Sequence, residues 1–94
     1  MHFQKINAGG VVRSDGVSIQ IKHHDYLDYK NSTGVAKVSM DYDPATREIN
    51  VYGSQADLWE TKNGMEAVPM PVREKMTLDL KEGLALLTGK FVVT

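Results

Sequence analysis

Residues 71–89, PVREKMTLDLKEGLALLTG, decide the fold class of this chain. Apolar side chains recur there at every third or fourth position, which places them on one face of a helix. The stripe consists of Val72, Met76, Leu80, Leu84 and Leu87. Pro71 suits the first helical position, where its missing N–H is not needed, and Gly89 suits the residue just past the end. The pattern therefore predicts a helix over residues 71–88.

Two further features of this segment indicate what the helix packs against. Gly83 stands inside the predicted helix, where glycine costs about 1 kcal/mol relative to alanine. A glycine at such a position indicates that another element approaches the helix backbone closely. Leu78 and Leu86 are expected to widen the apolar stripe, so we expect the helix to lie on a sheet.

The residues before and after the helix predict strands that are joined by turns. Apolar and polar residues alternate in most of them, as they do in strands with one buried face. The predicted strands are 10–12, 17–22, 35–42, 47–52 and 91–93. Turn residues at 13–16 join the first two into a hairpin, and turn residues at 43–46 join the next two. This order predicts an α+β domain, an antiparallel sheet of about five or six strands with the 71–88 helix on one face.

Two segments leave alternatives open. Residues 23–34, HHDYLDYKNSTG, either extend the preceding strand or form a loop that ends in the turn-like 31–34. Residues 54–59 are compatible with a further short strand, and the turn signal at 61–64 follows them. Because we find no repeat, low-complexity tract or linker, we expect a single domain over residues 1–94.

The composition excludes several classes of protein. The 94 residues include 11 Lys and Arg against 12 Asp and Glu, a net charge of −1, so we expect no nucleic-acid partner. No apolar stretch has the length of a membrane span, and the first residues lack the layout of a signal peptide. Cysteine is absent, which excludes disulfides and thiolate metal sites. We expect a soluble cytoplasmic domain with no membrane partner.

His23, His24 and Asp25 form the one cluster that offers metal ligands or acid–base groups. If they lie on a strand, the adjacent His side chains point to opposite faces and do not readily share one ion. No spaced His or Glu stands nearby to complete a coordination sphere. We therefore predict no metal and no cofactor, with a small metal-binding enzyme around His23 and His24 as an alternative.

Signatures of catalysis are missing from the sequence. Gly9-Gly10 precedes a predicted hairpin and not a helix, so it does not form a phosphate-binding loop. Asp41 and Asp43 flank a turn, which favours a turn role over glycosidase chemistry. Trp59 is expected to anchor the core or a sheet edge rather than to stack on a ligand. The sequence predicts a binding protein without catalytic residues.

The middle of the chain combines tyrosines with carboxylates, a combination that is typical of recognition surfaces. Residues 23–60 carry more acidic than basic side chains, which would steer a basic protein partner toward them. Tyrosine gives a large contact area at a low entropic cost. The predicted partner-binding residues are Asp25, Tyr26, Asp28, Tyr29 and Asp57. The alternative is that the tyrosine rings only cover the edge of the sheet.

Residues 34–94 resemble a known family. A strand that contains Tyr52 leads to Leu58-Trp59-Glu60, and a polar loop, the helix ending at Gly89 and the strand 91–93 follow. This arrangement is similar to the small immunity proteins of bacterial polymorphic toxin systems, specifically the immunity protein 74-like group. The resemblance implies a cytoplasmic antidote that binds and blocks a toxin domain and has no catalysis of its own. Many such toxins are basic nucleases, which agrees with the acidic middle of this chain.

A further function class stays open beside the resemblance. The chain could be an orphan accessory or structural protein from a phage or mobile gene cassette. Such a protein would form a homodimer through an open edge of its sheet, because unpaired strand edges are ready to pair with another chain. A homodimer with no other partner would distinguish this class from an antidote.

Overall fold

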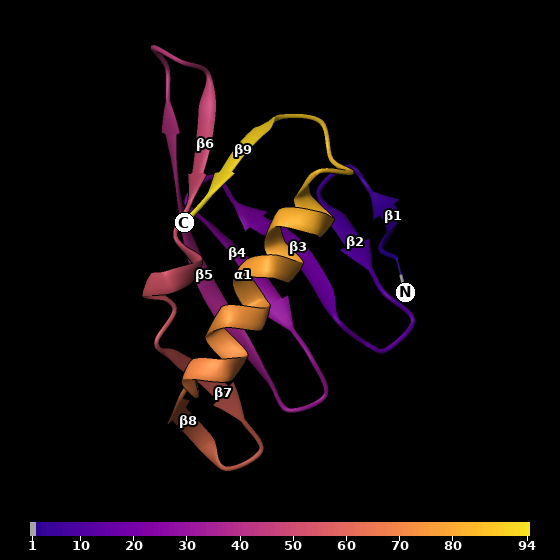
Figure 1. Ribbon diagram of the computed structural model, residues 1–94, viewed down its shortest axis with the longest axis vertical. Coiled ribbons are helices and arrows are strands. Elements are labelled where there is room, and N and C mark those ends of the chain that lie inside the picture. The colour runs from indigo at the N-terminus through magenta and orange to yellow at the C-terminus, as the bar shows by residue number, and fades with distance from the viewer. Residues whose placement is uncertain (1) are drawn as a thin grey trace.

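The computed structural model describes residues 2–94, which form nine strands, one α-helix and one short 3-10 helix (Figure 1). The first five strands are β1 (Gln4–Asn7), β2 (Gly10–Val12), β3 (Ser18–His23), β4 (Tyr26–Lys30) and β5 (Gly34–Asp43). The others are β6 (Glu48–Val51), β7 (Leu58–Thr61), β8 (Gly64–Ala67) and β9 (Lys90–Val93). The helices are η1 (Gly53–Gln55) and α1 (Met70–Leu84). The predicted α+β class is confirmed.

The strands form one curled sheet in the order β1-β2-β3-β4-β5-β6-β9. Strand β5 is the organising strand, since its first residues pair with β7 and its last residues pair with β6. Strand β8 pairs with β7 alone. All of these pairs are antiparallel except β6 and β9, which run parallel. The sheet is thus mostly antiparallel, and the crossover from β6 to β9 contains α1.

The sheet has nine strands and not the predicted five or six. Strands β1 and β8 escape prediction because all their residues are exposed, so no apolar alternation marks them. Of residues 23–34, only His23 extends β3, because the chain reverses at His24-Asp25 and returns as β4; the predicted turn at 31–34 covers the connection from β4 to β5. Residues 54–59 are not one strand either, since η1 occupies their beginning and β7 begins only at Leu58.

Helix α1 ends at Leu84, before the predicted end at residue 88. The helix begins at Met70, one residue before the predicted start, so Pro71 is its second residue and still lies in the first turn. Beyond Leu84 the hydrogen bonds span three residues instead of four: the Leu86 amide donates to the Gly83 carbonyl, and the Leu87 amide donates to the Leu84 carbonyl. This tightening turns the chain toward β9, and Gly89 adopts a φ of 138° within the connection instead of capping the helix.

The apolar stripe of α1 faces the sheet and forms the centre of the core. Met76, Leu80 and Leu84 are at most 1% exposed, and Leu87 stays buried although it lies beyond the helix. Leu78 and Leu86 are 65% and 46% exposed, so the prediction that they widen the stripe is wrong. The stripe packs on apolar residues from the facing strands, among them Val11, Ile19, Leu27, Val38 and Val51.

Gly83 lets α1 approach β2 and β3 closely, as the sequence indicates. A Cβ atom built on Gly83 would lie 2.7 Å from Ile19 Cδ1 and 3.0 Å from Val11 Cγ2. Both distances are shorter than ordinary van der Waals contact, so a side chain does not fit without movement of its neighbours. The glycine therefore fixes the distance between helix and sheet.

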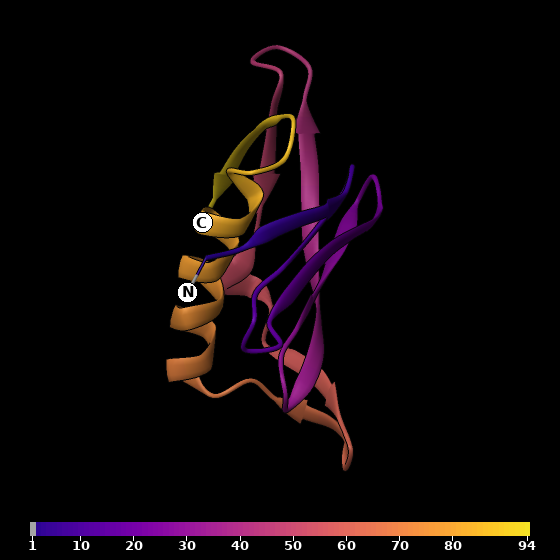
Figure 2. The ribbon, with the colours of Figure 1, turned by 90° about the vertical axis from the view of Figure 1, so that its right-hand side faces the viewer.

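Only one face of the sheet is covered by the helix. Figure 2 shows α1 on one side of the strands, while no further element of residues 2–94 covers the opposite side of β3, β4 and β5. We call this uncovered side the outer face. The β5–β6 hairpin extends beyond the end of α1, which gives the molecule its long dimension of 40 Å (Figure 1).

Candidate functional site

Strand β4 and the turn before it carry most of the predicted contact residues, and strand alternation separates them. Tyr26 and Asp28 point to the outer face and are partly exposed, whereas Leu27 and Tyr29 point to the core. Tyr29 is only 1% exposed. It is therefore a core residue and not the exposed contact that the sequence predicts, because β4 places it on the same face as Leu27.

Tyr26 is the centre of the candidate site. It lies opposite Ser39 of β5, and the ammonium group of Lys37 stands 4.5 Å from the centroid of its ring. An ammonium group at this distance above an aromatic face is a cation–π contact. A shallow pocket of about 370 Å³ surrounds the ring and is lined by His23, Asp25, Tyr26, Lys37 and Ser39. An aromatic ring beside both signs of charge suits recognition of a polar protein surface.

Asp28 lies on the same face of β4 as Tyr26 and is likewise partly exposed. It is paired across the sheet with Lys37 of β5, so the two charges face each other on the outer face. We define the Tyr26 patch as Asp25, Tyr26, Asp28 and Lys37. Asp57 is exposed but lies just before β7, and β5 separates β7 from β4. The structure therefore brings Asp25, Tyr26 and Asp28 together and leaves Asp57 apart.

The turn between β3 and β4 brings His23, His24 and Asp25 to one side. The His23 and His24 ring centroids are 4.0 Å apart, and His23 Nδ1 lies 2.6 Å from Asp25 Oδ1. This hydrogen bond holds the pKa of Asp25 below its usual value. The argument that the adjacent His side chains point to opposite faces is wrong, because His24 lies in a turn and not on a strand.

A second polar cluster, which sequence reasoning missed, lies between the sheet and α1. The Arg13 guanidinium donates to Asp79 Oδ1 at 2.8 Å and to Asp15 Oδ1 at 2.9 Å. The Tyr29 hydroxyl donates to Asp79 Oδ2 at 2.6 Å. Asp79 stands three residues after Met76 and four before Gly83, so its place on the buried stripe was readable from the spacing.

This buried cluster joins three separate segments of the chain through charge-assisted hydrogen bonds. Burial, and then the hydrogen bond to Asp79, raise the pKa of Tyr29 above its usual value. The hydrogen bond from Arg13 lowers the pKa of Asp15. Arg13 and Asp79 are 7% and 3% exposed, so neither charge is open to a ligand. We regard the cluster as a structural clamp between α1 and the sheet.

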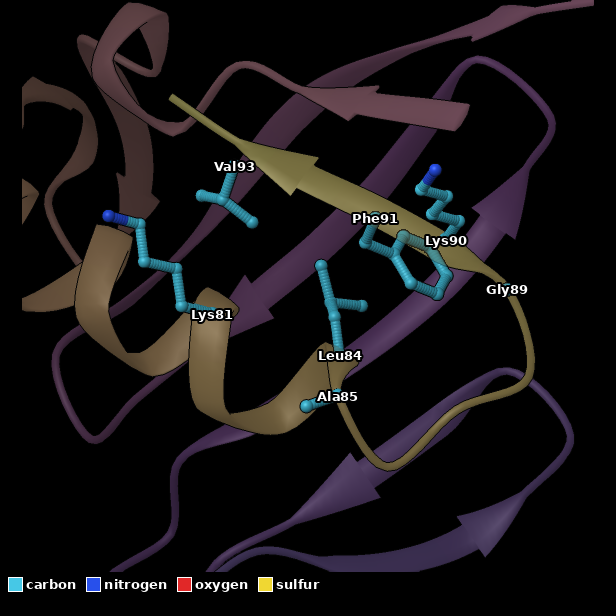
Figure 3. Close-up of a pocket in the computed structure, with 7 residues that line it drawn as sticks. All are labelled: Lys81, Leu84, Ala85, Gly89, Lys90, Phe91 and Val93. Atoms are coloured by element: carbon cyan, nitrogen blue, oxygen red, sulfur yellow. The ribbon is translucent and has the colours of Figure 1, made fainter. Parts of the chain in front are cut away.

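A further hollow of about 350 Å³ lies between the end of α1 and β9 (Figure 3). Leu84, Phe91 and Val93 supply its apolar walls. Lys81 and Lys90 stand at its opposite ends (Figure 3), and Lys90 Nζ lies 3.7 Å from Glu48 Oε2. Among the described residues, those that line it include no histidine, aspartate or glutamate.

Comparisons of the chain with protein-family models, with curated proteins and with solved structures find no match. Within residues 2–94, the structure contains no helix with the length and apolar character needed to cross a lipid bilayer.

Proposed function

We propose that this chain is a non-catalytic binding protein that engages a protein partner through the Tyr26 patch. The observation that carries the proposal is the position of Tyr26, a partly exposed ring on the one sheet face that α1 leaves uncovered. Tyrosine is enriched among the residues that dominate binding energies, because its ring fills a pocket while its hydroxyl finds a polar partner.

The charges around Tyr26 support a role in orienting the partner. Asp25 is well exposed at the turn, while Asp28 and Lys37 occupy opposite positions on the paired strands β4 and β5. The patch is therefore mixed in charge, and only Asp25 offers a carboxylate without a lysine directly opposite. A partner that presents a basic group near Asp25 and an aromatic-accepting pocket for Tyr26 would complement this arrangement.

Within this class we propose a toxin-neutralising immunity protein of the cytoplasm, with a basic toxin domain as its partner. The support comes from the resemblance of residues 34–94 to the immunity protein 74-like group and from the acidic excess of residues 23–60. An antidote of this kind acts by occupying a surface of the toxin, so it needs an exposed recognition face and no reactive group.

The alternative is an accessory or structural protein that pairs with itself. The observation that favours it is the free edge of β9, which is the last strand of the sheet and pairs only with β6 among the described strands. A second copy could add its own strand there through backbone hydrogen bonds. This interface would not include Tyr26, so the two proposals predict different effects of the same substitution.

The deciding experiment uses the full chain as bait in the native lysate, with quantitative mass spectrometry of the captured proteins. Wild type and Tyr26→Ala are compared, and Tyr42→Ala serves as the matched control because Tyr42 is an exposed tyrosine on the core-facing side, 55% exposed. We expect one partner that Tyr26→Ala loses and Tyr42→Ala retains. The partner is then purified, and its affinity for each variant is measured.

Against the purified partner, Tyr26→Ala should weaken binding by about 1–2 kcal/mol, roughly a 5- to 30-fold rise in Kd. Asp25→Asn should mainly slow association, and the effect should shrink as salt is added. If Tyr26→Ala and Tyr42→Ala bind the partner equally well, the interface lies elsewhere. A chain that captures only itself, with a dimeric mass that Tyr26→Ala does not change, would establish the homodimer instead.

A further inference from the structure

The β3–β4 turn concentrates three side chains of metal-ligand type within three consecutive residues. His23, His24 and Asp25 each offer a ligand atom, and these atoms lie within 4.8 Å of one another. All three side chains are exposed, so their torsions are free to adjust. Around a tetrahedral ion with bonds of about 2.0–2.2 Å, ligand atoms stand roughly 3.3 Å apart. Small rotations of exposed rings are enough to reach that spacing.

The backbone holds this turn in place. His23 pairs with Tyr26 at the end of the hairpin, so His24 and Asp25 alone make the reversal. The Asp25 carbonyl accepts a hydrogen bond of 2.8 Å from the Met40 amide of β5, which anchors the turn to the centre of the sheet. The register shift between Ile21 and His23 turns the end of β3 so that both imidazoles reach the same side. Because the backbone of the turn is anchored, mainly side-chain freedom is lost when the ligands bind an ion.

The donor set selects the class of ion. Two imidazoles with one carboxylate suit borderline divalent transition metals such as Zn²⁺, whereas Ca²⁺ and Mg²⁺ prefer oxygen ligands alone. The short contact between His23 Nδ1 and Asp25 Oδ1 shows that the carboxylate already stands at the ring nitrogen. A carboxylate beside a ligating imidazole either binds the ion itself or orients the ring.

We propose that His23, His24 and Asp25 bind one Zn²⁺-class ion at the β3–β4 turn. Each histidine gives one ring nitrogen and Asp25 gives a carboxylate oxygen, and water fills the open coordination. Binding of the ion does not require the proposed protein partner, but the site shares Asp25 with the Tyr26 patch, and the His23 ring centroid lies 6.1 Å from that of Tyr26. A bound ion would place positive charge at the edge of that patch.

The test is a Zn²⁺ titration of the full chain without an affinity tag, followed by calorimetry and by the imidazole proton signals in NMR. The chain has only three histidines, so His2 serves as an internal reference. We expect one ion per chain, with the His23 and His24 signals shifted and the His2 signal unmoved. His2→Ala should bind as the wild type does, while His24→Ala should lose at least about 10-fold in affinity.

Asp25→Asn tests whether the Asp25 carboxylate takes part in zinc binding. If it does, this variant should lose about 10- to 100-fold in affinity for Zn²⁺. At the same Zn²⁺ concentration the Tm of the wild type should rise more than that of His24→Ala, since an ion that binds only the folded state stabilises it in proportion to the logarithm of its affinity. Circular dichroism without zinc should show the same fold for all variants, because the residues are exposed. The inference is wrong if millimolar Zn²⁺ leaves the His23 and His24 signals in place, or if His2→Ala loses as much affinity as His24→Ala.

Discussion

Arg13 and Asp79 form a buried ion pair that ties the turn after β2 to the middle of α1. Arg13 Nη1 lies 2.8 Å from Asp79 Oδ1, and both side chains are almost fully enclosed. The more exposed Asp15 also binds the Arg13 guanidinium, with 2.9 Å between Arg13 Nε and Asp15 Oδ1. The centroid of the Phe3 ring lies 4.8 Å from Arg13 Cζ. Since a buried charge without a partner is far more costly than a matched pair, the two residues depend on each other.

Replacing Asp79 by Asn should lower the free energy of unfolding by about 3 kcal/mol, because Arg13 then keeps a buried charge with only its rim partner. Urea denaturation followed by circular dichroism measures this change. Asp41→Asn is the matched control, since Asp41 is exposed on β5 and should change stability by less than about 0.5 kcal/mol. Equal stability of the two variants would show that Arg13 reaches water when Asp79 is neutralised.

Tyr29 makes the stability of the fold sensitive to alkaline pH. Its pKa is raised by burial and by Asp79, so the folded chain keeps a phenolic proton that the unfolded chain releases above about pH 10. The contribution is fully present below that pH and is lost as pH rises through the folded pKa. Tyr29→Phe lacks this proton, so its free energy of unfolding does not contain this contribution. The excess stability of the wild type over Tyr29→Phe should therefore decrease from about pH 9 to about pH 11. A gap that stays constant over that range would contradict the assignment.

Gly83 and Ile19 should show a compensating pair of substitutions. Gly83→Ala gains helix propensity of about 1 kcal/mol, but its Cβ meets Ile19 Cδ1 at 2.7 Å, and overpacking typically costs about 1–3 kcal/mol. We expect a net loss of stability. Ile19→Val removes Cδ1, so Gly83→Ala should be less damaging, or even stabilising, in the Ile19→Val background. A double-mutant cycle measures this coupling, and a value near zero would place the close contact elsewhere.

Leu80 and Leu78 are two leucines of one helix with opposite surroundings. Leu80 is fully buried, and Leu80→Asp should remove several kcal/mol, which is close to the whole stability of so small a domain. Leu78 is 65% exposed, and Leu78→Asp should cost no more than about 0.5 kcal/mol. Thermal denaturation of both variants tests the pair. If both melt alike, the helix is rotated relative to the sheet.

The sequence predicts those elements whose buried face is long enough for apolar residues to recur at a regular spacing. The stripe of α1 and strand β5 of the β5–β6 hairpin are of this kind, whereas the last strand was predicted from its β-branched residues; each is found close to its predicted place. The stop at Leu84 was not predictable, because Ala85, Leu86 and Leu87 are good helix formers and only the return to β9 ends the helix. Leu87 is buried by that return and not by the helical period.

The candidate site shows the same limit. The sequence places tyrosines and carboxylates together in 23–29, but it does not say where β4 begins, and a strand start shifted by one residue exchanges its inner and outer faces. Because β4 begins at Tyr26, Tyr29 falls in the core and Tyr26 on the outer face. The sequence also does not reveal that the His23 and His24 rings lie close together, since this depends on the chain reversal at His24-Asp25.

The parallel pairing of β6 with β9 has a consequence for how the chain folds. Glu48 pairs with Lys90, so this contact closes a long stretch of chain that contains η1, β7, β8 and α1. The hairpins from β2 to β5 join neighbours in sequence and can form early, whereas contacts between distant residues are slow. We expect the β6–β9 pair to form after α1 has docked, because only residues 85–89 connect the helix to β9. We therefore expect docking of α1 to be the rate-limiting step of folding, with β9 as the last strand to acquire protected amides.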